Sequence, residues 1–189
     1  MRGSGAAAAI LHAPEGNHCH GGSIVASMTG AMPVPTETGH GYRLEVTAGM
    51  MELAGIAISL QLCTNYMEAL DNDTDIAIYC DNEPIVGFAV QGGEADAGAP
   101  HLEPLGTIVQ SMREGLLKHR CVGLRIARPD DGRRASNIRR ADAMAAAAAQ
   151  APAGFSDPWP SGVAGALREG MVILSDASPR AYDIMRRFF

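Results

Sequence analysis

The sequence has few aromatic residues, no excess of positive charge and no apolar run long enough to cross a membrane. Only 5% of its 189 residues are aromatic although 47% are hydrophobic, so we expect a core built from Ala, Ile, Leu and Met. The formal net charge of −6 argues against a strongly basic nucleic-acid-binding protein. Each apolar run is interrupted well short of the ~20 residues of a membrane span, which predicts no membrane association.

Disulfide pairs are not indicated, because the cysteines are few and irregularly spaced. This usage favours buried free thiols in a reducing, intracellular compartment, without distinguishing cytoplasm, nucleus and mitochondrion. The run 18–20 (His-Cys-His) offers soft metal ligands, but no second ligand pair follows at structural-zinc spacing. We interpret it as a loop bent by its glycines. The four cysteines are Cys19, Cys63, Cys80 and Cys121.

The apolar pattern predicts one α/β domain over residues 1–150. Its expected order is β-β-β-α-β-α-α-β-α, which gives a mixed five-stranded sheet with helices on its faces. A charged loop is expected at 128–136, before an alanine-rich last helix. The predicted strands are 6–13, 22–30, 42–47, 76–80 and 121–127, and the predicted helices are 50–70, 84–90, 105–119 and 137–149.

Residues 151–189 read as a C-terminal extension of this domain. A linker rich in Pro and Gly is followed by a short helix at 162–169, an apolar stretch at 171–174 and a final helix at 181–189. The apolar stripe of the final helix either docks on the domain itself or binds a protein partner through residues 155–189.

Three acidic residues fall on separate elements with apolar surroundings. Glu52 lies in the first turn of an apolar helix, Asp81 directly follows the strand 76–80, and Asp142 lies in the last helix. Mg²⁺ and Mn²⁺ prefer oxygen ligands, and two such ions clamp the attacking and leaving oxygens of a phosphodiester. Each acid also has a plainer interpretation: a solvated helix residue, a helix cap, and a first-turn acid favoured by the helix dipole, respectively.

With these acids in order, the chain resembles the ribonuclease H family over about residues 8–150. Residues 49–60, with Met-Glu-Leu at their start, are similar to the first helix of that family. Residues 76–82 are similar to its fourth strand, and their Cys-Asp-Asn ending is found in some retroelement versions. Residues 121–148 are similar to its last strand, loop and helix, where an Asn precedes the last acid by a few residues.

The resemblance implies that Glu52, Asp81 and Asp142 are the second, third and fourth metal-binding acids of that family. It implies Mg²⁺ or Mn²⁺ as the cofactor if the site is active, and none if it is not. An RNA–DNA hybrid or RNA would be the ligand, recognised by its shape and 2′-hydroxyls.

The departures from the family pattern concern the first acid and the substrate-holding segments. His12 stands where the first acid is expected, and a neutral imidazole suits zinc or manganese better than paired magnesium. Glu15 follows three residues later, so His12 or Glu15 would be an imperfect fourth catalytic ligand. The mobile histidine of the late loop is replaced by residues 130–132 (Asp-Asp-Gly), and residues 92–100 are acidic where many members carry a basic, tryptophan-rich segment.

Arginines near the last helix offer contacts to a phosphate backbone, because a guanidinium presents a planar fork of donors. Nearby aspartates allow a second interpretation, in which these arginines are solvated or paired within the chain. The candidate nucleic-acid-binding residues are Arg128, Arg133, Arg134 and Asn137.

Four functional hypotheses follow. The first is a ribonuclease-H-like, nucleic-acid-associated domain whose hydrolysis of the RNA strand of hybrids is impaired or lost. The second is an active, metal-dependent ribonuclease H with an atypical site, and the third is a structural subunit of a larger assembly such as a ribonucleoprotein. The fourth is an unrelated α/β protein, which predicts that the three carboxyl groups lie far apart.

Overall fold

The fold is a mixed α/β arrangement, seen in a computed structural model. The structure describes residues 4–12, 24–33, 43–70, 75–91, 100–117, 122–128, 130, 132–150 and 159–174. Its elements are β1 (Ser4–His12), β2 (Ile24–Pro33), β3 (Arg43–Glu45), α1 (Ala48–Leu70), β4 (Ile76–Cys80), α2 (Glu83–Val90), the 3-10 helix η1 (Pro100–Leu102), α3 (Glu103–Leu117), β5 (Val122–Ile126), α4 (Arg133–Gln150), α5 (Val163–Glu169) and β6 (Val172–Leu174).

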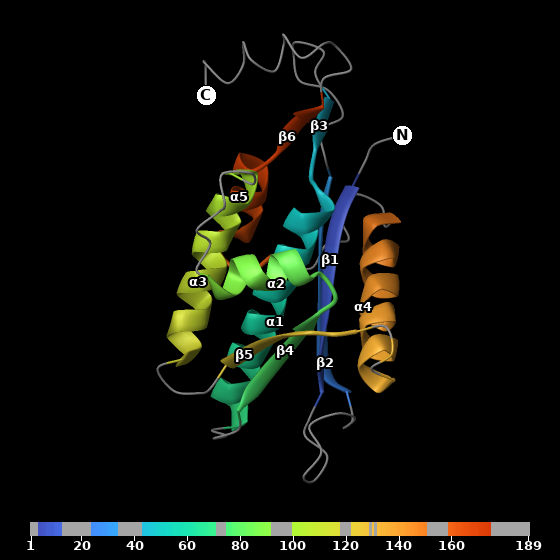
Figure 1. The fold of residues 1–189 in the computed structure, drawn as a ribbon, viewed down its shortest axis with the longest axis vertical. Coiled ribbons are helices and arrows are strands. Elements are labelled where there is room, and N and C mark those ends of the chain that lie inside the picture. The colour runs from blue at the N-terminus through green and yellow to red at the C-terminus, as the bar shows by residue number, and fades with distance from the viewer. Residues whose placement is uncertain are drawn as a thin grey trace.

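An antiparallel ribbon of β1 and β2 lies between helix α4 and the other helices (Figure 1). Its register runs from Ser4 opposite Pro33 to His12 opposite Ile24. The ribbon is rich in Ala and Gly, and these small side chains let helices approach closely. Helix α4 packs on one side of the ribbon and α1 on the other.

The second ladder is the parallel pair β4 and β5. Parallel strands need a long crossover, and here α2, η1 and α3 provide it. The core fills the space between α1, α3 and the strands. Its largest fully buried side chains include Met50, Leu53 and Leu60 of α1 with Leu105 and Val109 of α3.

The third ladder joins β3 to β6 in antiparallel register, so residues 172–174 pair with residues 43–45. Helix α5 buries Val163 and Leu167 and packs on α3 and α1. The part of the predicted extension that the structure describes therefore docks on this chain. The boundary at residue 150 stays a prediction, and the predicted helix 181–189 lies outside the described residues.

The order of strands and helices through residue 150 matches the predicted order, and the α/β class is confirmed. The described strands form three two-stranded ladders, however, and not the predicted five-stranded sheet. Two features account for the difference: β3 has only three residues and pairs with β6, and a pocket is lined by both β1 and β4.

Two predicted boundaries are also corrected. Helix α4 begins at Arg133 and not at Asn137, because Arg and Ala favour the helix and Gly132 supplies the left-handed turn (φ 56°) before it. Strand β2 continues to Pro33, where a proline is tolerated at the strand end. Within the described residues, the structure contains no helix that is both long and apolar enough to span a membrane.

Candidate functional site

A cavity of about 270 Å³ is lined by β1, α1, β4 and α4 together. The alanines of β1 and side chains such as Ile56, Ile78 and Ile138 make most of its wall apolar. The predicted catalytic residues His12, Glu52, Asp81 and Asp142 all line it. The three acids Glu52, Asp81 and Asp142 therefore line one cavity.

Glu52 lies in the second turn of α1, on the face that packs toward β1, and is half-buried. Burial raises the pKa of its carboxyl group, and the neighbouring charges of Asp81 and Asp142 raise it further. A hydrogen bond from the Asn82 side chain acts in the opposite direction. The Oε2 atom is buried and has no hydrogen-bond partner among the described residues, so this carboxylate is held in an unfavourable environment.

Asp81 follows β4 directly and is exposed, but it does not cap the next helix. The cap is Asn82, with φ −96° and ψ 100°, whose Oδ1 accepts a hydrogen bond from the Ile85 backbone N–H at 3.2 Å. The sequence signal for this cap was the Asn-Glu-Pro order, since Asn is a preferred N-cap and Pro is tolerated in the first turn. Asn82 is a residue of the site that was not predicted from the sequence.

Asp142 lies in the third turn of α4, because the helix starts at Arg133. The interpretation as a first-turn acid stabilised by the helix dipole is therefore wrong, since that effect fades beyond the first turn. Burial, followed by the charge of Asp81, raises the pKa of Asp142. The carboxylates of Glu52, Asp81 and Asp142 thus repel one another from three separate elements.

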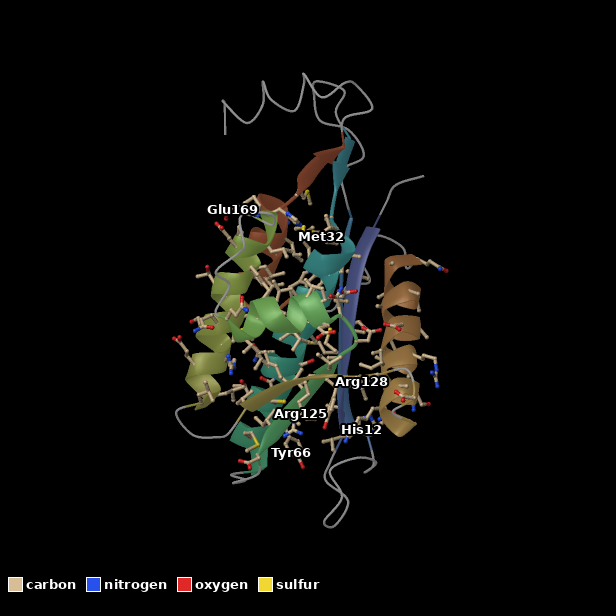
Figure 2. The ribbon with its side chains drawn as sticks, in the orientation of Figure 1. His12, Met32, Tyr66, Arg125, Arg128 and Glu169 are labelled. Atoms are coloured by element: carbon tan, nitrogen blue, oxygen red, sulfur yellow. The ribbon has the colours of Figure 1, made fainter. Side chains whose placement is uncertain are left out.

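His12 lines the same cavity at the far end of β1 (Figure 2). A Cβ on Gly5 would meet Met51 Sδ at 2.8 Å, and one on Gly55 would lie 3.8 Å from the Ala8 carbonyl oxygen. Glu52 is therefore level with the stretch from Gly5 to Ala8. His12 is four residues beyond Ala8, which is about 13 Å at ~3.3 Å per residue of strand.

The donor atoms fit a hard divalent cation, but their spacing does not. Three carboxylates are suitable ligands for Mg²⁺ or Mn²⁺. The Oε2 atom of Glu52, which has no hydrogen-bond partner among the described residues, is available to bind such an ion. Among the described residues, however, no three His, Cys, Asp or Glu side chains are close enough to hold one ion. As they stand, the described side chains of this site therefore do not fit a bound metal ion.

The candidate nucleic-acid contacts divide into two groups. Arg134 and Asn137 line the cavity from α4, whereas Arg128 is exposed on the segment after β5 (Figure 2). The side chain of Arg133 and the residue Glu15 lie outside the described part of the structure. Sequence reasoning missed Tyr79 on β4, whose ring centroid lies 4.8 Å from Arg134 Cζ.

Two cysteines line the cavity as free thiols, Cys63 of α1 and Cys80 of β4. Burial raises the pKa of the Cys63 thiol to about 11, and burial is also the main cause that raises the pKa of Cys80. Both thiols are therefore protonated at neutral pH and are poor nucleophiles. Cys19 and Cys121 lie outside the described residues.

Comparison with known proteins gives no match: no family model, curated protein or solved structure is significantly similar to this chain.

Proposed function

We propose that this chain is a ribonuclease-H-like domain that associates with RNA–DNA hybrids or RNA and whose hydrolytic activity is impaired or lost. The observation that carries the proposal is the gathering of Glu52, Asp81 and Asp142 at one cavity from α1, the end of β4 and α4. These acids belong to the three segments on which the resemblance rests, in the same order along the chain.

We also propose that the strands of this domain form one sheet of the ribonuclease H type. The antiparallel β1–β2 ribbon and the parallel β4–β5 pair would be two parts of one ribonuclease-H-like sheet, with β3 as its fifth strand. The element order supports this assignment. The cavity between β1 and β4 residues would then lie where the two parts of the sheet meet.

Impaired catalysis is supported by the first-acid position. The part of β1 level with Glu52 carries only small apolar residues, and His12 lies at the other end of the cavity. A two-metal phosphodiesterase needs ligands that hold both ions a few ångströms apart. Among the described residues, the three carboxylates have no fourth acid beside them and are not close enough to share an ion, which favours weak metal binding.

The alternative, an active nuclease with an atypical metal site, is supported by one observation. The pKa values of Glu52 and Asp142 are both raised by burial and by neighbouring carboxylates, and a bound divalent cation would relieve that repulsion. To be the ligands of Mg²⁺ or Mn²⁺, Glu52, Asp81 and Asp142 would have to draw closer together than they stand in this structure.

The test is binding and cleavage of a labelled RNA–DNA hybrid by the full chain, at low salt, in Mg²⁺ and then in Mn²⁺. We expect saturable binding of the hybrid and cleavage no faster than in a protein-free control. Cleavage that Asp81→Asn abolishes would replace this proposal with the active alternative. Absence of hybrid and RNA binding at low salt would reject nucleic-acid association and leave a structural role.

A further inference from the structure

Tyr79 and Arg134 form a stacked pair across two elements of the cavity. Tyr79 belongs to β4 and Arg134 to the first turn of α4, and both are half-buried. The guanidinium carbon lies 4.8 Å from the ring centroid, within the ~6 Å range of a cation–π interaction. Because both side chains line the cavity, the pair is part of its wall.

Arg134 is the only Lys or Arg among the described residues that line this cavity. The same wall carries Glu52, Asp81 and Asp142, whose negative charges repel a phosphate group. A phosphodiester that enters this site therefore needs a cation close by, and Arg134 is the described side chain in position to supply it.

Stacking also determines how the arginine presents its donors. The N–H groups of a guanidinium lie in its plane, so a ring that holds one face fixes the directions of those donors. A fork held in this way matches two oxygens of a phosphate, which a lysine ammonium does not. Asn137, three residues further along α4 and on the same helix face, lines the cavity too and offers an amide donor beside the fork.

We propose that Arg134, oriented by its stacking on Tyr79, binds a phosphodiester of an RNA–DNA hybrid at this cavity. Tyr79 is then a positioning residue that acts through Arg134. The inference rests on the proposed function, because it names the residues through which the hybrid is held. It adds a tyrosine on β4 to a binding surface that the sequence placed only on arginines and an asparagine after β5.

The experiment measures hybrid affinity of the full chain over a salt series. Arg134→Gln is expected to weaken binding about tenfold and to reduce the slope of log K against log salt by about 1, since one phosphate contact is lost. Tyr79→Leu is expected to weaken binding about threefold to tenfold with an unchanged slope. Tyr79→Phe keeps the ring and should bind as the unsubstituted chain does.

Arg140→Gln is the matched control. Arg140 lies on the same helix and is exposed, and it does not line the cavity, so its loss should change affinity less than the loss of Arg134. Equal effects of Arg134→Gln and Arg140→Gln would overturn the inference while leaving hybrid binding intact. Wild-type affinity of Tyr79→Leu would overturn the positioning role.

Circular dichroism of each variant separates loss of fold from loss of contact. If Arg134→Gln does not fold, Arg134→Lys carries the test, because it keeps the charge and removes the planar fork. Weaker binding with an unchanged salt slope would then support the inference, and wild-type affinity would overturn it. If the unsubstituted chain binds no hybrid, the proposed function and this inference fail together.

Discussion

Asn82 hydrogen-bonds the carboxylate of Glu52 with the same side chain that caps α2. Its oxygen accepts from the backbone N–H of Ile85, which leaves its amide N–H groups to donate to the carboxylate. The bond lowers the pKa of Glu52 against the larger raising effect of burial. The Asn82 side chain thus caps the start of α2 and also favours the charged form of Glu52 in the cavity.

Asn82→Ala should destabilise the protein by about 1 kcal/mol or somewhat more, because α2 loses its cap and Glu52 loses a donor. Urea unfolding at neutral pH measures the change. Asn65→Ala is the control, since Asn65 is exposed on α1 and its side chain accepts a surface hydrogen bond from Gln61. A loss no larger than that of Asn65→Ala would show that the cap and the bond to Glu52 contribute little.

Glu52→Gln should stabilise the protein at neutral pH and have little effect at acidic pH. A carboxyl group whose pKa is raised on folding binds its proton more tightly in the folded state, so its contribution to stability falls as pH rises from its ordinary pKa through the raised value. Gln removes the charge and can still accept from Asn82. The melting temperature of both proteins across that pH range tests this.

Glu169→Gln provides the comparison for this pH dependence, because Glu169 is exposed on α5 and away from the cavity lining. Its melting temperature should follow that of the unsubstituted chain at every pH. If the melting temperature of Glu52→Gln also equals that of the unsubstituted chain at every pH, repulsion and burial at Glu52 do not limit stability.

The sequence predicted most of the elements that surround the site. The helical spacing of Met51, Leu53, Ile56 and Leu60 predicted α1, and the short apolar run 76–80 predicted β4. Both predictions succeed because the spacing of apolar residues within one segment indicates its secondary structure. The gathering of Glu52, Asp81 and Asp142 followed from the order of those elements and from the family resemblance.

What the sequence did not predict depends on contacts between distant segments. Strand β3 falls within the predicted strand 42–47, but its pairing with β6 joins residues far apart in the chain. The stacking of Arg134 on Tyr79 needs α4 to lie beside β4, which no local pattern encodes. The start of α4 was misplaced because a run of arginines favours both an exposed helix and a solvated loop.

Millimolar Mg²⁺ or Mn²⁺ should raise the melting temperature by no more than about 1 °C, and EDTA should leave it unchanged. No three described ligands stand close enough to share an ion, and a cation at or below its Kd stabilises a fold by at most about 0.4 kcal/mol. Differential scanning fluorimetry with and without metal makes the measurement. A shift of several degrees that Asp81→Asn removes would show an assembled metal site.

His12→Asp should leave hybrid cleavage at the level of the unsubstituted chain. The new carboxylate would lie about 13 Å further along β1 than Ala8, whereas Glu52 is level with the stretch that ends at Ala8. The assay uses labelled hybrid in Mn²⁺ with Asp81→Asn as the inactive reference. Cleavage gained by His12→Asp would mean that an intact scaffold had lost one ligand at residue 12.

Gly30→Ala should destabilise the protein by about 1–3 kcal/mol, because the indole of Trp159 occupies the space where a Cβ would stand. A Cβ at Gly30 would lie 2.5 Å from Trp159 Cε3, and a rigid ring cannot yield as a flexible chain end does. Trp159 is the only tryptophan, so its fluorescence reports the displacement directly.

Gly87→Ala is the matched control: no atom lies within 4 Å of its Cβ, and alanine favours helix α2 by up to about 1 kcal/mol. Equal stability and equal emission of the two variants would show that residues 159–174 are not held against β2 by this contact.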